Sequence, residues 1–543
     1  MPTAITVHDP RLPALSERME LTPRLDSLHR REVLLFDNGK LAPAFGGYGA
    51  VFDALEGELR KRGARIRGEV ADLLALTGSQ LERLADDVAA RAPDAVVLAV
   101  CDTGVSMPTT VFATELERRG IPASLVAYGI GAQVARATLA RVLPGVPVLE
   151  LNCDRTVPYD GVAREMADGV SDRVVDSLLA TPAELVRRFE ASGVPAAVDL
   201  RPDATIELRA DDPTLTFTDM MRLSGLGDGF PLIPPTFARV DAMLHAMRAD
   251  PGDEVWSPVI PRMQPVTARD VAVVAVMAGC PVATGPLVLA AFRAMNADEF
   301  RLFQAAITTH PAGTLVLVSG PGSSRMGVEA GPGSLGPGHP VNAAVGRAVA
   351  MSYNALLGLR PGGGDLTVLG SPAEFSYCVA EALDASPWPG HNADVADESD
   401  TVVTVVKCEG PQNVLDNVST TANELLDCIA ANLHGVGRNN SYVPRAQTIV
   451  FLNPEHAKIV AGTGWTKQDV QHYLYDVARS DRDDLAGGGI TPIWPAWFRG
   501  LDRIPIVARP EDLLVVVTGG HGPQSAVALP WGYSRGVTVT LGG

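Results

Sequence analysis

The chain has 543 residues, of which 46% are hydrophobic and 20% are charged, a composition typical of a well-buried globular protein and not of a disordered chain. This length predicts two or more domains. The formal net charge of −18 argues against nucleic acid and against an anionic membrane surface as partners.

The lack of a recognisable targeting signal and the pattern of cysteines predict a cytoplasmic protein. Residues 1–18 carry prolines and charges where a signal peptide needs an apolar run, and no stretch approaches the roughly 20 apolar residues that span a bilayer. The cysteines are scattered without a CxxC pair, which predicts neither a disulfide framework nor a local zinc site (Cys101, Cys153, Cys280, Cys378, Cys408 and Cys428). No cofactor is predicted. A metal held by residues from distant segments, such as His310, His521 and Glu381, stays open.

The first part of the chain alternates between apolar runs and amphipathic stretches. This alternation predicts a parallel sheet with helices on both faces, joined by right-handed crossovers. The run from Asp94 to Val100 is continuously apolar after its first residue, as in a strand that is buried on both faces. The predicted strands are 33–36, 94–100, 121–127 and 147–151, and the predicted helices are 50–62, 81–90 and 109–119.

Between residues 196 and 214 this periodicity fades, and we place a domain boundary there. We predict an α/β fold, with a three-layer parallel-sheet domain over residues 1–205 and a larger α/β domain over residues 206–543. In the second domain, apolar segments alternate with loops rich in glycine and proline, which let the backbone approach ligands closely. A helix is predicted at 237–247, followed by apolar segments at 271–279, 285–295, 314–319, 366–369, 402–406, 448–452 and 513–518.

A polar loop follows the buried strand of the first domain. Ligands of parallel α/β sheets bind beyond the carboxyl ends of the strands, and backbone N–H groups at the start of the next helix can bind an anion or a developing oxyanion. Ser106 or Thr109 is expected at or near the N-cap of that helix. The candidate catalytic residues of this loop are Asp102, Thr103 and Ser106, and the candidate substrate-binding residues are Lys40 and Thr109.

The segment that contains this loop resembles the UGSC family and, more distantly, the selenoprotein subunit of glycine reductase component B. Asp102, Gly104 and the run Glu115–Pro122 match the family, in which the strand ends in Asp, then selenocysteine or cysteine, Gly, Ser and Cys. Upstream, the loop at 37–40 (Asp-Asn-Gly-Lys) is similar to the family's Asp-Asn-x-Lys loop. The resemblance covers residues 30–160.

This sequence departs from the family at both reactive positions. Thr103 stands at the position of the selenium or sulfur, and Ser106 stands at the position of the resolving cysteine. A hydroxyl has a far higher pKa than a thiol and forms no disulfide, so we expect chemistry without external redox. Cys101 ends the strand, and its side chain is expected on the opposite face from Asp102. The plain alternative is a turn that persists in a domain without catalytic function.

Four polar segments of the second domain flank apolar runs, as in an active site assembled from several loops. They lie at 305–311, 331–342, 375–381 and 518–525, and none is a P-loop or a dinucleotide-binding motif. His310 and His521 are candidates for proton transfer, although an isolated loop histidine is more often structural. Cys378 and Glu381 would share one face if their segment were helical. The candidate substrate-binding residues here are Thr309, Ser334, Asn342, Arg347, Ser376, Glu381 and Ser525.

The sequence leaves three functions open. The favoured one is a non-redox enzyme that makes or breaks a carbon–heteroatom bond in a small polar metabolite, of lyase, hydrolase or condensing type. The second is a thiol-dependent reductase that uses Cys101 or Cys378, and survival of activity after alkylation of every accessible cysteine would exclude it. The third is a non-catalytic binding or scaffold protein.

We expect one site between the domains and a homo-oligomeric assembly. The shared-site hypothesis places Asp102, Thr103 and Ser106 in a cleft that also receives the 308–311, 331–342 or 518–525 loop. Extensive apolar content favours association over a monomer.

Overall fold

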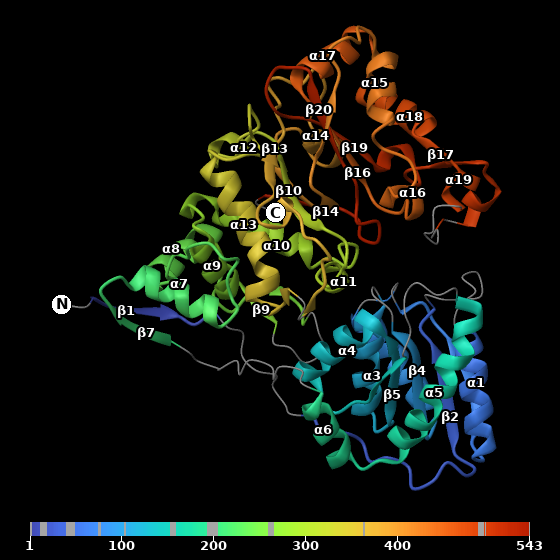
Figure 1. The fold of residues 1–543 in the computed structure, drawn as a ribbon. Helices are drawn as coiled ribbons and strands as arrows, with labels where there is room; N and C mark the ends of the chain where they lie inside the picture. Colours follow the sequence, from blue (N-terminus) through green and yellow to red (C-terminus); the bar gives the residue numbers. More distant parts are fainter. Residues whose placement is uncertain are drawn as a thin grey trace.

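The computed structural model describes residues 3–10, 19–39, 49–73, 76, 78–101, 105–151, 159–192, 205–258, 265–361, 364–486, 494 and 496–541. The α/β fold that the sequence predicts is confirmed, with one wholly parallel sheet in the first part of the chain and two mixed sheets in the second (Figure 1). None of the helices in these described ranges combines the length and the apolarity that a bilayer span requires.

The first part is a three-layer unit around a five-stranded parallel sheet of order β3-β2-β4-β5-β6. Helices α2, α3 and α4 pack on one face of this sheet, and α1 and α5 pack on the other. The strands are β2 (Glu32–Asp37), β3 (Arg65–Val70), β4 (Ala95–Cys101), β5 (Ala123–Tyr128) and β6 (Val148–Leu151). The helices are α1 (Gly49–Lys61), α2 (Gly78–Ala90), α3 (Ser106–Arg118), α4 (Gly129–Val142), α5 (Tyr159–Leu179) and α6 (Pro182–Ala191).

Residues Ala95–Ala99 of β4 are completely buried, because both faces of this central strand are covered by helices. The predicted strands and helices of this part are therefore present, within a few residues at their ends. The sequence did not predict β3, whose residues are polar because it lies at the edge of the sheet with exposed positions. It also did not predict helices α4, α5 and α6.

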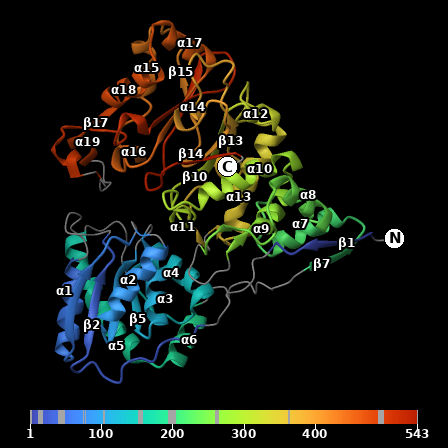
Figure 2. The same ribbon diagram turned by 180° about the vertical axis from the view of Figure 1, so that it is seen from behind.

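The first strand of the chain lies apart from this sheet. Strand β1 (Thr3–His8) pairs antiparallel with β7 (Thr205–Ala210), and the backbone N–H of His8 donates to the carbonyl oxygen of Pro235 at 2.9 Å. Figure 2 shows this pair beside α7 (Pro213–Leu223) and α8 (Phe237–Met247). Residues 3–8 thus lie beside the beginning of the second predicted domain, and the division at residue 205 stays a prediction.

In the second part, a four-stranded sheet of order β13-β10-β14-β21 carries helices on one face and a second sheet on the other. The strands are β10 (Ala312–Ser319), β13 (Cys378–Ala380), β14 (Val402–Glu409) and β21 (Val537–Thr540). The covering helices are α9 (Ala268–Ala278), α10 (Gly285–Met295) and α13 (Pro340–Ala355). Two of the apolar segments that the sequence singled out, 271–279 and 285–295, are therefore helices, and 366–369 forms no strand.

The second sheet has the order β15-β20-β16-β19 and packs against the first through Val406, Cys408, Phe451 and Val516. Its strands are β15 (Gln412–Leu415), β16 (Thr448–Leu452), β19 (Leu513–Val517) and β20 (Gln524–Ala528), and its outer face is covered by α15 (Ala422–Ala430), α17 (Pro454–Gly462) and α18 (Lys467–Val477). The remaining short elements of the described chain are β8 (Glu254–Trp256), β9 (Val266–Thr267), η3 (Val282–Thr284), α11 (Leu302–Ala305), α12 (Gly322–Arg325), β11 (Arg360–Pro361), β12 (Gly364–Asp365), η4 (Pro372–Glu374), α14 (His391–Val395), α16 (Asn439–Tyr442), β17 (Arg479–Asp481), α19 (Arg482–Ala486), η5 (Ala496–Gly500), β18 (Arg503–Pro505) and η6 (Pro510–Asp512).

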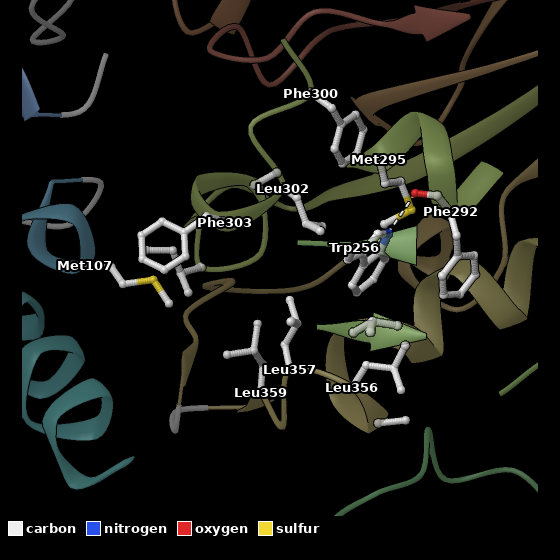
Figure 3. Packing of buried hydrophobic residues seen from close by; sticks show 14 of the residues in the cluster. Met107, Trp256, Phe292, Met295, Phe300, Leu302, Phe303, Leu356, Leu357 and Leu359 are labelled. Atoms are coloured by element: carbon white, nitrogen blue, oxygen red, sulfur yellow. Dashed lines mark hydrogen bonds between the residues drawn. The ribbon is translucent and has the colours of Figure 1, made fainter. Parts of the chain in front are cut away.

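The two parts touch where the first turn of α3 meets α11. Figure 3 shows the Met107 side chain pointing toward Phe303, and both residues belong to one buried apolar cluster. Beside them, Gln304 Nε2 donates to the carbonyl oxygen of Leu76 at 3.0 Å. The carboxyl edge of the parallel sheet therefore faces α11 in the second part.

Our first prediction concerns a buried ion pair that ties residues 19–31 to α3. Arg24 Nη1 lies 2.8 Å from Glu117 Oε1, and both side chains are almost completely buried. Removing one partner leaves the other charge buried, so Arg24→Met should lower the free energy of unfolding by about 3 kcal/mol. Chemical denaturation measures this change. Arg209→Met is the matched control, because its partner Glu207 is exposed, and an equal effect of both variants would contradict the assignment.

Candidate functional site

The second part contains a cavity of about 810 Å³ between α13, the β10–β14 strands and the loop around η4. Its lining includes several polar residues, among them Thr314, Tyr353, Asp365, Glu374 and Lys407. Apolar residues line its outer rim, among them Val368, Leu369 and Phe375. Such a combination of an apolar wall with a few convergent polar groups is typical of a small-molecule site.

Strand pairing fixes the position of Lys407. In the antiparallel register of β10 and β14, Lys407 lies opposite Thr314. Side chains alternate along a strand, so Lys407 shares its face with Val403 and Val405, which belong to the apolar cluster under α13. Lys407 therefore occupies a core position and is only 6% exposed.

The amine of Lys407 has no counter-charge in contact with it. Among the residues that the structure describes, Lys407 Nζ forms no ion pair within 4.0 Å and no hydrogen bond, and it lies 4.7 Å from the centre of the Tyr353 ring. The Tyr353 hydroxyl is 2.7 Å from Thr314 Oγ1, which fixes the ring. A buried amine without a fixed partner is a group that is available to a ligand.

Burial lowers the pKa of Lys407 from 10.5 to about 8, and the nearby carboxylates of Glu374 and Asp365 oppose this shift in part. A lysine of this pKa is a neutral amine in a substantial fraction of molecules near pH 8. Burial also raises the pKa of Glu374, and the positive charge of Lys407 is the main influence that opposes this rise. The cavity thus holds an amine and a carboxyl group whose pKa values are shifted toward each other.

The two carboxylates are held at the cavity wall by short turns. Glu374 Oε2 accepts a hydrogen bond from the backbone N–H of Ser371 at 2.6 Å, in a capping box of η4. Asp365 Oδ1 accepts hydrogen bonds from the Thr367 backbone N–H and hydroxyl. Where this loop crosses β10, a Cβ atom on Gly313 would lie 2.3 Å from the Ala373 carbonyl oxygen, so only glycine allows this approach.

A second cavity of about 440 Å³ adjoins the first and shares residues 370–372 with it. Glu409 lines this cavity, and its Oε1 lies 2.9 Å from His310 Nε2. Glu409 also follows Lys407 by two residues on β14, so the two side chains lie on the same face of the strand. Of the two histidines that the sequence suggested for proton transfer, His310 is therefore placed next to the candidate site.

Three residues of the polar loop in the first part, Lys40, Asp102 and Thr103, lie outside the described residues. Ser106 is buried as the first residue of α3, and the N-cap position belongs to Val105, which makes no side-chain cap. Thr109 Oγ1 donates to the Val105 carbonyl oxygen at 2.7 Å. Ser106 therefore lies next to the N-cap, as expected, but neither it nor Thr109 is the N-cap residue, because Val105 is already in the helical conformation.

Three of the substrate-binding residues that the sequence suggested lie at or near the cavities. The Thr309 carbonyl oxygen accepts a hydrogen bond from the Val368 N–H of the rim. Arg347 forms a two-point ion pair with Asp228, which lines the large cavity. Ser376 lines the small cavity and donates to the Ala343 carbonyl oxygen at 2.9 Å.

Other predicted residues lie elsewhere in the second part and are tied into the fold. Asn342 Nδ2 donates to two backbone carbonyl oxygens, one of them that of Ser334. Ser525 Oγ is 2.8 Å from His456 Nδ1 in the buried contact between β20 and α17, whereas His521 is exposed.

Glu381 is buried and accepts hydrogen bonds from the Ser319 hydroxyl and the His391 backbone N–H, and burial raises its pKa. It follows the strand β13, so Cys378 and Glu381 do not share a helical face. Within the described ranges, no group of three or more His, Cys, Asp or Glu side chains is placed to hold a metal ion, and His310, His521 and Glu381 are not brought together.

Sequence reasoning missed Lys407 and both carboxylates beside it. The available signal was a single lysine that directly follows the apolar run 402–406 and continues the alternation of Val403 and Val405. A charged residue at a core-facing strand position is rarely buried without a functional or structural reason.

No protein-family model and no curated protein matches the chain. Solved structures that share parts of it include a periplasmic ribose ABC transporter from Conexibacter woesei, with 17% identity, 27% of this chain and 52% of that chain covered, and a TM-score of 0.15. They also include a radical S-adenosylmethionine methyltransferase from Kitasatospora setae, with 15% identity, 46% and 45% covered, and a TM-score of 0.19. The chain spans about half the length of each, and similarities of this size carry no argument about fold or function.

The second prediction uses the stability of a Lys407 variant as a function of pH. Below pH 8 the amine is protonated in both the folded and the unfolded chain, so the folded chain bears the full cost of the buried charge. Lys407→Met should then raise the free energy of unfolding at pH 7 by about 1–3 kcal/mol.

Between pH 8 and 10.5 the folded protein releases this proton while the unfolded chain retains it, so the wild type gains stability and the difference narrows. Urea denaturation of both proteins at pH 7 and pH 9.5 measures the difference. A variant that is less stable than the wild type at pH 7, or a difference that does not change with pH, would contradict the buried amine.

Proposed function

We propose that the protein is an enzyme that acts on a small carbonyl compound, with the amine of Lys407 as the nucleophile. The observation that supports this proposal is a buried lysine of lowered pKa that faces a cavity without a bound counter-charge. A neutral amine attacks a carbonyl carbon to form a carbinolamine, which loses water to give an imine. A new carbon–nitrogen bond forms, the carbonyl oxygen leaves as water, and hydrolysis of the imine restores the amine.

The neighbours of Lys407 suit the proton transfers of this reaction. Glu374, whose pKa is raised by burial, would donate the proton that allows the carbinolamine hydroxyl to leave as water. Asp365, on the same wall, would stabilise the cationic imine. The Tyr353 ring, held by Thr314, lies 4.7 Å from the Lys407 amine and would orient it. Each of these residues lines the cavity and can approach a bound ligand.

The proposal agrees with the non-redox chemistry that the sequence favours, since the carbon–nitrogen bond to Lys407 forms and breaks without a change in oxidation state. Three of the cysteines support the same choice. Burial raises the pKa of the Cys280 and Cys408 thiols to about 12 and that of Cys378 still further, so none of them supplies a thiolate near neutral pH. The resemblance of residues 30–160 to the UGSC family, and a contribution of Asp102 and Thr103 to the same reaction, stay proposals.

The third prediction tests the nucleophile with 2,4-pentanedione, a diketone that converts neutral amines into enaminones with a near-ultraviolet absorption band. At pH 8, Lys407 should react at least about tenfold faster than an ordinary lysine, because ordinary lysines are almost wholly protonated at that pH. Peptide mass spectrometry locates the adduct. The exposed Lys61 in the same sample is the internal reference.

Two variants sharpen this test. Lys407→Arg should abolish the fast formation of the enaminone. Lys467→Arg should leave it unchanged, because Lys467 does not line the cavity and its amine lies 2.8 Å from Asp394. Glu374→Gln should slow enaminone formation while Lys407 remains the residue that reacts. If Lys407 reacts no faster than Lys61, the proposed nucleophile is wrong and a non-catalytic binding protein becomes the better account.

A further inference from the structure

We infer that the substrate is an uncharged aldehyde or ketone that carries an apolar chain or ring, with its carbonyl group at Lys407 and its apolar portion on the rim of the cavity. This inference rests on the proposed function and adds the class of substrate. Three features of the cavity carry it: a buried amine, an exposed apolar rim, and an excess of carboxyl groups over basic groups among the lining residues.

The amine of the cavity is buried, whereas the exposed side chains of its lining are apolar. Lys407 is 6% exposed and Thr314 is buried. At the rim, Val368 is 70% exposed and Leu369 is 92% exposed, although both line the same cavity. A ligand that reaches Lys407 must therefore pass along apolar side chains, and a molecule with one polar end and one apolar end matches this order.

The rim continues onto an aromatic pair. Phe375, which lines the cavity and is half exposed, meets Phe230 edge to face with ring centres 5.4 Å apart. The guanidinium group of Arg347 lies 5.8 Å from the Phe230 ring centre. Four large apolar side chains that are exposed together on one rim form a patch that gains free energy when a ligand covers it (Phe230, Val368, Leu369 and Phe375).

The charges of the lining residues disfavour an anionic ligand. Asp365 and Glu374 line the cavity, and within the described part of the chain neither forms an ion pair with a basic side chain. The third carboxylate, Asp228, is already matched by Arg347. Among the described residues that line the cavity, Lys407 is the only basic one, and a carboxylate on the substrate would lie beside the Asp365 carboxylate and the Glu374 carboxyl group with only this amine to match it. A neutral carbonyl compound avoids this repulsion.

The experiment traps imines with cyanoborohydride, which delivers a hydride to the imine carbon and leaves a secondary amine that mass spectrometry detects on the Lys407 peptide. Propanal and hexanal differ by three methylene groups, so half-saturation of trapping should occur at a concentration at least about tenfold lower for hexanal. 2-Hexanone and 2-oxohexanoate carry the same butyl chain on the carbonyl carbon, but the oxo acid has a carboxylate where the ketone has a methyl group. The ketone should be trapped at Lys407 at a lower concentration than the oxo acid.

Variants of the rim test whether its apolar side chains cause the preference for hexanal over propanal. Val368→Ser with Leu369→Ser should remove most of the advantage of hexanal over propanal, and the fold should tolerate the change because both side chains are exposed. Val418→Ser is the matched control, since Val418 is 81% exposed and lines neither cavity. It should leave the advantage unchanged.

The outcomes separate this inference from the proposed function. Trapping at Lys407 that shows no dependence on chain length, or that prefers 2-oxohexanoate, would overturn the inferred substrate class and retain the nucleophile. A dependence on chain length that survives in the rim variant would also overturn it. A lack of trapping at Lys407 with every carbonyl compound, and with 2,4-pentanedione, would overturn the proposed function itself.

Discussion

The antiparallel pairing of β10 with β14 is the constraint on which the candidate site depends. It sets Lys407 opposite Thr314, in a sheet that is covered by helices on one face and by a second sheet on the other. With neighbouring positions of β14 packed on both faces, the lysine is largely shielded from water and meets open space only at the cavity that it lines. Lowering its pKa from 10.5 to about 8 corresponds to about 3 kcal/mol, a cost that the surrounding apolar packing can offset.

The other parts of the site are arranged around this buried amine. Helix α13 supplies Tyr353 from above the sheet, and the loop before β13 supplies Glu374 through the capping box of η4. The loop can pass over β10 only because Gly313 has no side chain. Each of these features, a tyrosine on a helix, a capping box and a glycine at a close approach, is local and common in proteins. Their combination produces an amine and a carboxyl group of shifted pKa at the end of a cavity with an apolar entrance.

The sequence was sufficient for the parallel sheet because apolar runs alternate with amphipathic stretches, and Ala95–Ala99 is a continuous apolar run typical of a doubly covered strand. It was not sufficient for the site. Lys407, Tyr353 and Glu374 are widely separated along the chain, and only the register of β10 and β14, the packing of α13 and the turn at η4 bring them together. His310 was found by its local setting, yet its partner Glu409 is known only from the same register.

The pKa of Lys407 tests the account most directly. Because the chain has few lysines, isotope labelling of their ε-carbons gives a simple spectrum in which the Lys407→Arg variant identifies the Lys407 signal. The chemical shift of this signal, followed from pH 6 to pH 11, reports the protonation of the amine. The account predicts a midpoint at about pH 8, as expected for a buried amine without a bound counter-charge. A midpoint near the ordinary lysine value of 10.5 would contradict it.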